Sequence, residues 1–383
     1  MAWAGGLSAI AIWGVHDGKA RAFDPDGLTR PFGPLGDLLV APAARWDATW
    51  FLAIARDGYV PDPDRAAFFP LYPGLVALLS PLTGALLGAI VLSLACFLVG
   101  LAAFHRLAVL EIGPAGARWA VAGMALFPGS LWFSSAYSEA LFLAVSVGAV
   151  LCAREQRWGA AGMLGALAAA TRSAGVLLVV PLALLWLEAR RSGRAQPADG
   201  VWIAMVPVGL LAYCTYLAAV GVGFTAPFDA QETWHRTFAG PWAGPVDGAV
   251  AAWQGLRQLL HGSPEPVFFT AAGGDPMEVA RHNIMLFAFL VLALVALVGA
   301  LRRLPAAHGA YALVALLLPL SYPVAPQPLM SLPRFLAVLY PLFLWLGWWL
   351  ARGGALRRRV ALGAFACGLA AFSALSSTWH WVA

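Results

Sequence analysis

The chain has 383 residues, of which 61% are hydrophobic and only 11% are charged. Because water-soluble domains carry about 25% charged residues, this composition excludes an ordinary soluble enzyme. The formal net charge of +5 is no sign of nucleic-acid binding, since membrane proteins use positive charge to set their orientation. The apolar residues form long blocks separated by short breaks with arginine or proline, and this pattern predicts an all-α, polytopic membrane protein.

Membrane crossings are expected where an apolar block approaches the roughly 20 residues that a helix needs to span a bilayer. The first block, 3–15, has no basic stretch before it and no convincing cleavage site after it, so we expect an anchor rather than a signal peptide. With this block the sequence predicts about 11 transmembrane helices, near residues 3–15, 84–105, 117–133, 138–153, 158–171, 174–188, 201–221, 283–301, 308–325, 334–351 and 360–380.

Arginines in the short connections predict the face of the membrane on which each loop lies. They gather on every second connection, which assigns that face to the cytoplasm: Arg106 and Arg118, Arg154 and Arg157, Arg190, Arg191 and Arg194, Arg302 and Arg303, Arg352 and Arg357 to Arg359. The extracytoplasmic face then has two large loops, 16–83 and 222–282. No internal repeat or linker is visible, so we expect a single integral domain over residues 1–383.

An apolar stretch at 68–82 would break this assignment if it crossed the membrane. Its shortness and its prolines Pro70, Pro73 and Pro81 favour a helix that lies along the outer surface instead. We therefore expect surface-lying helices in the first large extracytoplasmic loop.

The same loop contains the strongest candidate for chemistry, Asp47. It lies among aromatic residues on an expected short interfacial helix, whose depth Trp46 and Trp50 would fix. A partly desolvated carboxylate there is suited to removing a proton from a hydroxyl. A structural role is the alternative, in which Asp47 caps the helix or pairs with Arg45 or Arg56.

Three more charged residues stand at the outer ends of predicted spans, where an unexplained charge marks a candidate site. Arg172 and Arg334 break the positive-inside pattern, and arginine binds phosphate oxygens with two donors at once. Ion pairs with loop carboxylates, or snorkelling, would also explain them. Glu139 follows Ser138 at the start of a span, where a carboxylate favoured by the helix dipole is the competing explanation.

The second large loop contains a repeat of Trp253, Leu256 and Leu260 at helical spacing within residues 249–261. This pattern is typical of an amphipathic helix at the membrane interface, which would act as a lid over a site.

Neither a metal site nor a disulfide is predicted. Asp229, Glu232 and His235 are spaced to share one helix face, but a solvated face explains them better than a bound metal. All four cysteines lie inside apolar blocks and indicate small core residues: Cys96, Cys152, Cys214 and Cys367.

The segments 45–59 (RWDATWFLAIARDGY) and 67–73 (AFFPLYP) resemble the PIG-V family of mannosyltransferases, which have the GT-C glycosyltransferase fold. Shorter segments resemble further family blocks in the same order, at 137–141 (YSEAL), 172–175 (RSAG) and 333–335 (PRF), and more weakly at 231–242. The resemblance extends over about residues 45–340. One departure is Ala174, where many relatives have asparagine, and it leaves the donor preference in question.

The resemblance implies an inverting transfer of mannose from polyprenyl phosphate mannose to a hydroxyl of a lipid-linked or glycan acceptor on the extracytoplasmic face, without a cofactor. Asp47 would be the general base, and Arg172 and Arg334 would bind the donor phosphate. The sugar or the acceptor would contact Glu139, Trp46, Tyr72 and Tyr137. Eukaryotic members act on the GPI-anchor precursor, but this compact chain, whose basic residues are almost all arginine, looks like a bacterial relative. The acceptor therefore stays open.

Two alternatives also stay open. A related GT-C enzyme would transfer another sugar, such as arabinose or glucose, from the same carrier. A lipid or sugar transporter would use the same outer charges, although the missing repeat symmetry speaks against it. Membrane lipids are expected contacts and nucleic acid is not, while no protein partner is predicted.

Overall fold

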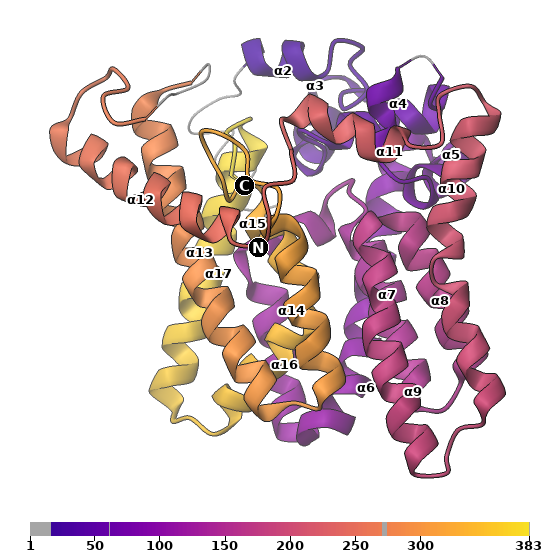
Figure 1. Ribbon diagram of the computed structural model, residues 1–383. Coiled ribbons are helices and arrows are strands. Elements are labelled where there is room, and N and C mark those ends of the chain that lie inside the picture. Colours follow the sequence, from indigo (N-terminus) through magenta and orange to yellow (C-terminus); the bar gives the residue numbers. More distant parts are fainter. Residues whose placement is uncertain (1–16, 61, 270–273, 383) are drawn as a thin grey trace.

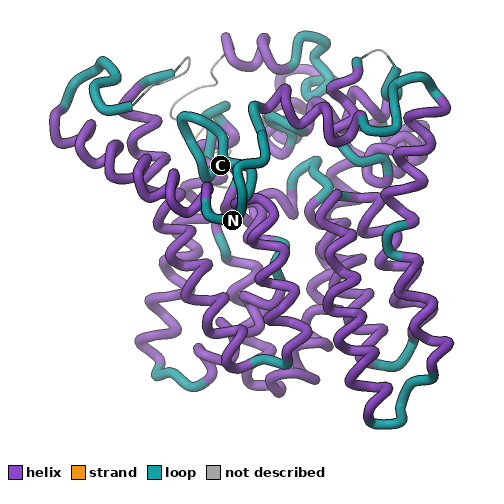
Figure 2. The backbone as a smooth tube through the Cα atoms, viewed as in Figure 1, coloured by secondary structure: helices purple, strands orange, loops and turns teal. Residues whose placement is uncertain are grey.

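The computed structural model describes residues 17–60, 62–269 and 274–382. Within these ranges the chain forms helices and loops but no strand, as Figure 2 shows. The predicted all-α class is therefore confirmed. The predicted crossing at 3–15 lies outside the described residues.

The helices form a bundle that is closed at one end by a second set of helices, which we call the cap layer (Figure 1). The bundle contains α6 (Ala85–Leu126), α7 (Glu139–Arg154), α8 (Trp158–Thr171), α9 (Val179–Arg191), α10 (Val208–Ala219), α13 (Pro276–Arg303), α14 (Ala306–Leu320), α16 (Tyr340–Ala351) and α17 (Ala355–Ser377). The cap layer contains α2 (Asp17–Phe23), α3 (Gly33–Val40), α4 (Ala48–Asp57), α5 (Leu71–Thr83), α11 (Ala226–Asp229), α12 (Ala243–His261) and α15 (Leu332–Ala337). Short 3-10 helices complete the chain: η1 (Ala41–Ala43), η2 (Pro63–Ala67), η3 (Pro128–Ser134), η4 (Ser173–Leu178), η5 (Pro197–Met205) and η6 (Ala230–Trp234).

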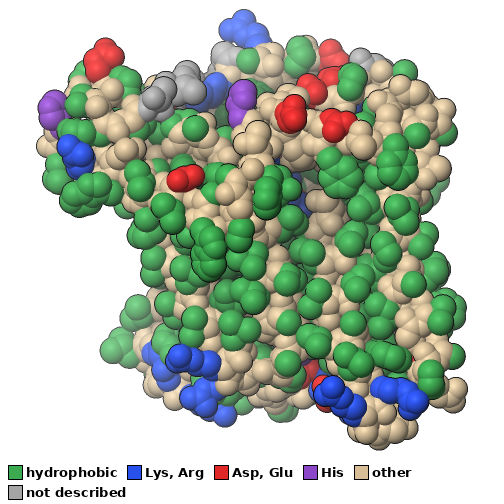
Figure 3. Space-filling model, viewed as in Figure 1, with side chains coloured by type: hydrophobic (Ala, Val, Ile, Leu, Met, Phe, Trp, Pro, Cys, Tyr) green, Lys and Arg blue, Asp and Glu red, His purple; other side chains and the backbone are tan. Residues whose placement is uncertain are grey.

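The bundle is built to cross a membrane. Among the described residues, five helices are long and apolar enough to span a bilayer, and counting two bent helix pairs as spans raises this to seven. Apolar side chains cover the middle of the molecule, while charged ones gather at its two ends (Figure 3). Three further predicted crossings are helices of only 14, 15 and 12 residues, namely α8, α14 and α16. The protein is thus a multi-pass membrane protein, and the count of about 11 stays a prediction.

The predicted crossings near 84–105 and 117–133 join at a sharp break inside α6. Gly113 has φ 76° and ψ 167°, and Pro114 follows it. Glycine adopts this backbone conformation without a Cβ clash, and proline disfavours a helical residue before it. The second of the two helices ends at Leu126, earlier than predicted, because Pro128 begins η3.

Both surface helices expected from the sequence exist. The stretch 68–82 overlaps α5, which ends at Thr83 before Gly84, with φ 75°, and exposes Leu78 and Leu82. Residues 249–261 belong to the longer α12, whose outer face exposes Trp253 and Leu260. The opposite face of α12 lies so close to α13 that a Cβ on Gly255 would stand 2.7 Å from the Ala280 carbonyl oxygen.

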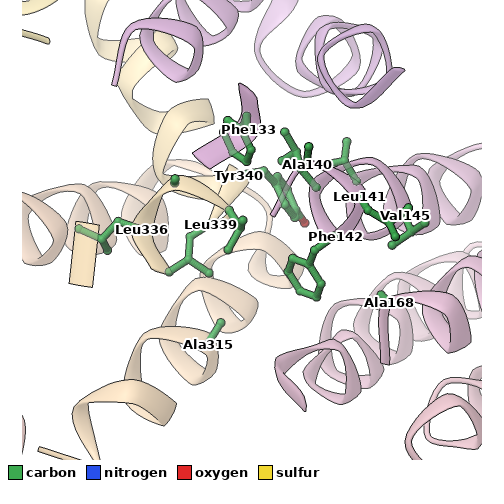
Figure 4. Close-up of a cluster of buried hydrophobic side chains, with 14 of the residues drawn as sticks. Phe133, Ala140, Leu141, Phe142, Val145, Ala168, Ala315, Leu336, Leu339 and Tyr340 are labelled. Carbon is green, nitrogen blue, oxygen red and sulfur yellow. The ribbon is translucent and has the colours of Figure 1, made fainter. Parts of the chain in front are cut away.

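Beneath the cap layer, large apolar side chains pack where α7, α15 and α16 meet. Phe133, Phe142, Leu336, Leu339 and Tyr340 converge there (Figure 4) and are all largely shielded from solvent. This cluster is adjacent in sequence to two predicted site residues, one on α7 and one on α15. It therefore gives both of them a rigid support.

Candidate active site

A cavity of about 970 Å³ lies where the cap layer meets the bundle. Four of the predicted site residues line it: Trp46, Asp47, Arg172 and Arg334. They come from the turn that precedes α4, the α8–η4 junction and α15, so the fold brings together positions up to 288 residues apart, from 46 to 334. Glu139 lies directly behind this wall, fully buried at the start of α7.

The backbone around Asp47 is held in a specific shape. Trp46 has φ 54°, a left-handed conformation that is uncommon outside glycine. The Tyr137 hydroxyl accepts a hydrogen bond from the Asp47 N–H at 3.1 Å and donates one to the Arg45 carbonyl oxygen at 2.8 Å. Tyr137 thereby bridges the turn that places Asp47 at the cavity wall.

The structure shows that Asp47 has none of the local structural partners that its sequence neighbours offered. Its side chain stands at the N-cap of α4 but makes no capping hydrogen bond. Arg56 pairs instead with Asp26 and Asp57, and Arg45 donates from Nε to the Ser377 carbonyl oxygen at 3.2 Å. Asp47 Oδ2 is ion-paired with Arg334 Nη1. Asp47 is thus neither a helix cap nor a partner of its sequence neighbours.

Glu139 is the shared anchor of two guanidinium groups. Its Oε1 accepts from Arg172 Nη1 and from Arg334 Nε, and the side chain has no exposed surface. Ser138, which also fails to cap α7, accepts from Arg172 Nη1 at 3.4 Å. A buried carboxylate needs such partners, because an unpaired charge away from water is costly. Glu139 therefore fixes Arg172 and Arg334 and does not itself line the cavity.

Arg236 is a site residue that the sequence reasoning did not select. It lines the cavity, and its Nη2 donates to the Met330 carbonyl oxygen at 3.3 Å. Its guanidinium carbon and that of Arg172 lie 5.6 and 5.9 Å from the centre of the Phe335 ring. The only sequence signal for it was the weak family block at 231–242.

Arg236 leaves the cluster with a surplus of positive charge. No carboxylate lies within ion-pair distance of Arg236 among the described residues, so three guanidiniums face two carboxylates. Burial, and then the neighbouring charge of Arg334, lower the pKa of Arg236 to about 10. A cation so placed favours an anion beside it, and arginine geometry suits phosphate oxygens.

Trp46, directly before Asp47, belongs to an aromatic cluster. Its ring centre lies 4.8 Å from that of Phe23, 5.5 Å from that of Trp379 and 5.1 Å from that of Trp381. The Lys19 ammonium lies 5.9 Å from the Trp46 ring centre. The cavity thus has an arginine-lined part and an aromatic part, with Asp47 between them.

Besides Glu139, two more residues that were expected to contact the sugar or the acceptor do not line the cavity. Tyr72 is fully buried and its hydroxyl bonds to the Ala89 carbonyl oxygen at 3.0 Å and to Ser93 Oγ at 2.9 Å. Tyr137 uses its hydroxyl on the backbone, as described above. Neither lines the cavity, because both side chains are buried among other residues of the protein. Their geometry supports positioning roles.

No group of three His, Cys, Asp or Glu side chains that could hold a metal ion occurs in the part of the chain that the structure describes. Asp229, Glu232 and His235 do not share a helix face. Asp229 ends α11 and accepts from Thr225 Oγ1, whereas His235 follows η6 with φ 54°.

Comparison with known proteins supports the sequence resemblance. Residues 34–188 match the family model described as mannosyltransferase (PIG-V). GPI alpha-1,6-mannosyltransferase 2 of Rattus norvegicus is 36% identical over 180 residues, which is 43% of this chain and 36% of that protein. The enzyme of the same name from Homo sapiens is 31% identical over 180 residues, with the same shares of the two chains. The predicted resemblance to the PIG-V family is thereby confirmed over the part that contains Asp47, Glu139 and Arg172.

The matched segment spans about a third of the length of these curated relatives. Arg236 and Arg334 lie outside the residues that match the family model. Among solved structures, ArnT from Cupriavidus metallidurans bound to undecaprenyl phosphate has a TM-score of 0.42 and 15% identity, covering 88% of this chain and 75% of that one. An Archaeoglobus fulgidus oligosaccharyltransferase has a TM-score of 0.47 and 11% identity, covering 100% of this chain and 56% of that one.

Proposed function

We propose that the protein is a mannosyltransferase that moves mannose from a polyprenyl phosphate mannose to an acceptor hydroxyl, with inversion at the anomeric carbon. The observation that supports this most is a carboxylate, Asp47, beside three guanidiniums in one cavity. The family match to mannosyltransferases supports the sugar.

The cavity has a charged region for the phosphate of a lipid phosphate donor and an apolar region for its isoprenoid chain. Arg172, Arg236 and Arg334 offer fixed donors for the phosphate, whose negative charge grows as the glycosidic bond breaks. From there the cavity continues along apolar side chains of η4, α10 and α14, including Leu177, Leu210 and Leu318. An apolar wall inside a membrane suits an isoprenoid chain.

We infer the course of the reaction from the ion pairs of the site. Arg334 holds Asp47 Oδ2, so Oδ1 is the oxygen free to receive the acceptor proton. A donor phosphate competes for Arg334 and weakens its hold on Asp47, which raises the basicity of the carboxylate. The acceptor oxygen then bonds to the anomeric carbon as its proton passes to Asp47. The bond from that carbon to the phosphate oxygen breaks, and polyprenyl phosphate leaves with the electron pair.

The cavity belongs to the extracytoplasmic face in this proposal. Helices α7 and α13 have cavity residues near their N-terminal ends, whereas their last turns contain Arg154 and Arg302 with Arg303. In Figure 3 a group of Lys and Arg side chains likewise lies at the end opposite the cap layer. The positive-inside rule assigns that basic end to the cytoplasm.

The test is a transfer assay with purified protein in membrane vesicles and three synthetic donors that differ only in the sugar: mannose, glucose or arabinose on the same polyprenyl phosphate. The proposal predicts a new mannoside of inverted configuration and much slower transfer of the other two sugars. Preferred transfer of glucose or arabinose would replace the sugar but keep the reaction. Movement of the donor across the vesicle membrane without a new glycosidic bond would favour a transporter and contradict the proposal.

A further inference from the structure

The aromatic part of the cavity is not explained by donor binding. Beyond Trp46 the wall is formed by Trp381 near the C-terminus and by Glu278 and His282 from the start of α13. Glu278 and His282 are four residues apart and so lie on the same face of the helix, and His282 lies against the Trp381 backbone. These residues form one continuous surface that begins next to Asp47.

This surface differs in chemistry from the arginine part. It combines two half-buried indole rings with a carboxylate and an imidazole, and Gln327 lines the same cavity. Aromatic faces pack against the C–H face of a sugar or cyclitol ring, while carboxylate, imidazole and amide groups bond to its hydroxyls. Glu278 and Lys19 both line this part of the cavity, so their opposite charges compensate and an anionic group gains less here than beside the three arginines.

Contacts of Arg45 with the C-terminal residues hold this surface in place. Arg45, directly before Trp46, donates to the carbonyl oxygen of Ser377 at the end of α17, and its guanidinium carbon lies 5.1 Å from the Trp379 ring centre. These contacts tie the C-terminal aromatic residues to the loop that holds Asp47. The Trp46 indole N–H is buried and has no hydrogen-bond partner among the described residues.

We infer that Trp46, Trp381, Glu278 and His282 form the acceptor subsite, and that the acceptor presents an uncharged, polyhydroxylated ring there. The ring stacks on the indoles and directs one hydroxyl to Asp47, while any lipid attached to it extends away toward the membrane. That the bound ring is the acceptor rests on the proposed function. The binding site itself can be tested without turnover.

The experiment measures binding to the full chain in lipid nanodiscs by saturation-transfer NMR. The probes are methyl α-D-mannopyranoside, methyl α-D-glucopyranoside and myo-inositol, with a serine-containing peptide as a non-ring hydroxyl and farnesyl phosphate as a donor fragment. The variants are Trp381→Ala and the milder Glu278→Gln. Trp242→Ala serves as a matched control, because Trp242 is 76% exposed and does not line the cavity.

At least one ring compound is expected to bind, and each cavity variant should weaken it about fivefold or more, as loss of a contact worth roughly 1 kcal/mol does. Affinity for farnesyl phosphate should stay unchanged, and Trp242→Ala should change neither. Absence of ring binding, binding of the peptide alone, or a loss confined to farnesyl phosphate would overturn the inference. Ring binding in a protein that transfers no sugar would contradict the proposed function alone.

Discussion

Two buried clusters of charged side chains lie at opposite ends of the bundle, and their charges are balanced differently. At the end opposite the cap layer, Glu111 on α6 contacts Arg154 Nε at 2.6 Å and His308 Nε2 at 3.2 Å. His308 Nδ1 lies 3.0 Å from the Tyr340 hydroxyl. None of these residues lines the 970 Å³ cavity. We call them the Glu111 cluster.

At the cap layer, the Glu139 cluster consists of Glu139, Asp47, Arg172, Arg334 and Arg236. It resembles the Glu111 cluster in having a buried carboxylate paired with arginine. It differs because Arg236 has no carboxylate partner among the described residues, and because four of its five members line the cavity. A buried carboxylate with cationic partners therefore occurs in both clusters, and what distinguishes the Glu139 cluster is its surplus guanidinium and its place at the cavity wall.

The largest effects should come from removing the two central carboxylates. Glu139→Gln leaves the buried Arg172 without a carboxylate partner, and removing one member of a buried ion pair destabilises a protein by about 3–5 kcal/mol. Glu111→Gln leaves Arg154 its longer contact with Glu188, at 3.7 Å. Thermal unfolding in detergent should therefore show a loss of stability for both variants, and the larger loss for Glu139→Gln. Mannosyl transfer per folded molecule should collapse only for Glu139→Gln. Equal loss of transfer in both variants would erase the proposed difference between the clusters.

Removing Arg236, the cation without a carboxylate partner among the described residues, should weaken donor binding. Arg236→Gln removes a charge-assisted contact worth about 1.5–3 kcal/mol, so the KM for the donor should rise about 10- to 100-fold. Kinetics with polyprenyl phosphate mannose measure this. Arg257→Gln on α12, whose guanidinium carbon lies 4.1 Å from the Phe268 ring centre and outside the cavity, is the control and should change little. An unchanged KM in Arg236→Gln would remove Arg236 from the donor site.

A smaller effect on kcat should distinguish two buried tyrosines, one in each cluster region. Tyr137→Phe releases the turn around Asp47, and Tyr340→Phe releases only His308, so each should cost about 1 kcal/mol of stability. Only Tyr137→Phe should also lower kcat, by several-fold, while the donor KM stays constant. A lowered kcat in Tyr340→Phe but not in Tyr137→Phe would reverse the assignment.

Removal of divalent metal ions is expected to have no effect on the transfer rate. Both clusters pair carboxylates with arginine or histidine, and the proposed mechanism uses no metal ion. Treatment with EDTA should therefore leave the transfer rate unchanged. A loss of transfer that an added divalent ion restores would show that the mechanism lacks a component.

Much of the architecture could be predicted from the sequence, because apolar blocks and proline breaks act locally. The helices at 68–82 and 249–261 and the break near Pro114 follow from such local signals. Asp47, Arg172 and Arg334 were selected because a charge at the end of an apolar block has few explanations. The pairing of Asp47 with Arg334, 287 residues away, could not be read from the chain, and its neighbours Arg45 and Arg56 were the natural candidates. Arg236 sits in a long loop without an apolar block beside it, so nothing local distinguished it.

The central claim is that Asp47 removes the acceptor proton. The most direct measurement compares kcat for mannosyl transfer in wild type and Asp47→Asn, both purified, shown to be folded and saturated with polyprenyl phosphate mannose. Asparagine keeps the shape and a hydrogen bond but is no base, so kcat should fall about 10²- to 10⁴-fold while the donor still binds. Equal transfer by the two proteins would show that Asp47 is structural and would contradict the mechanism.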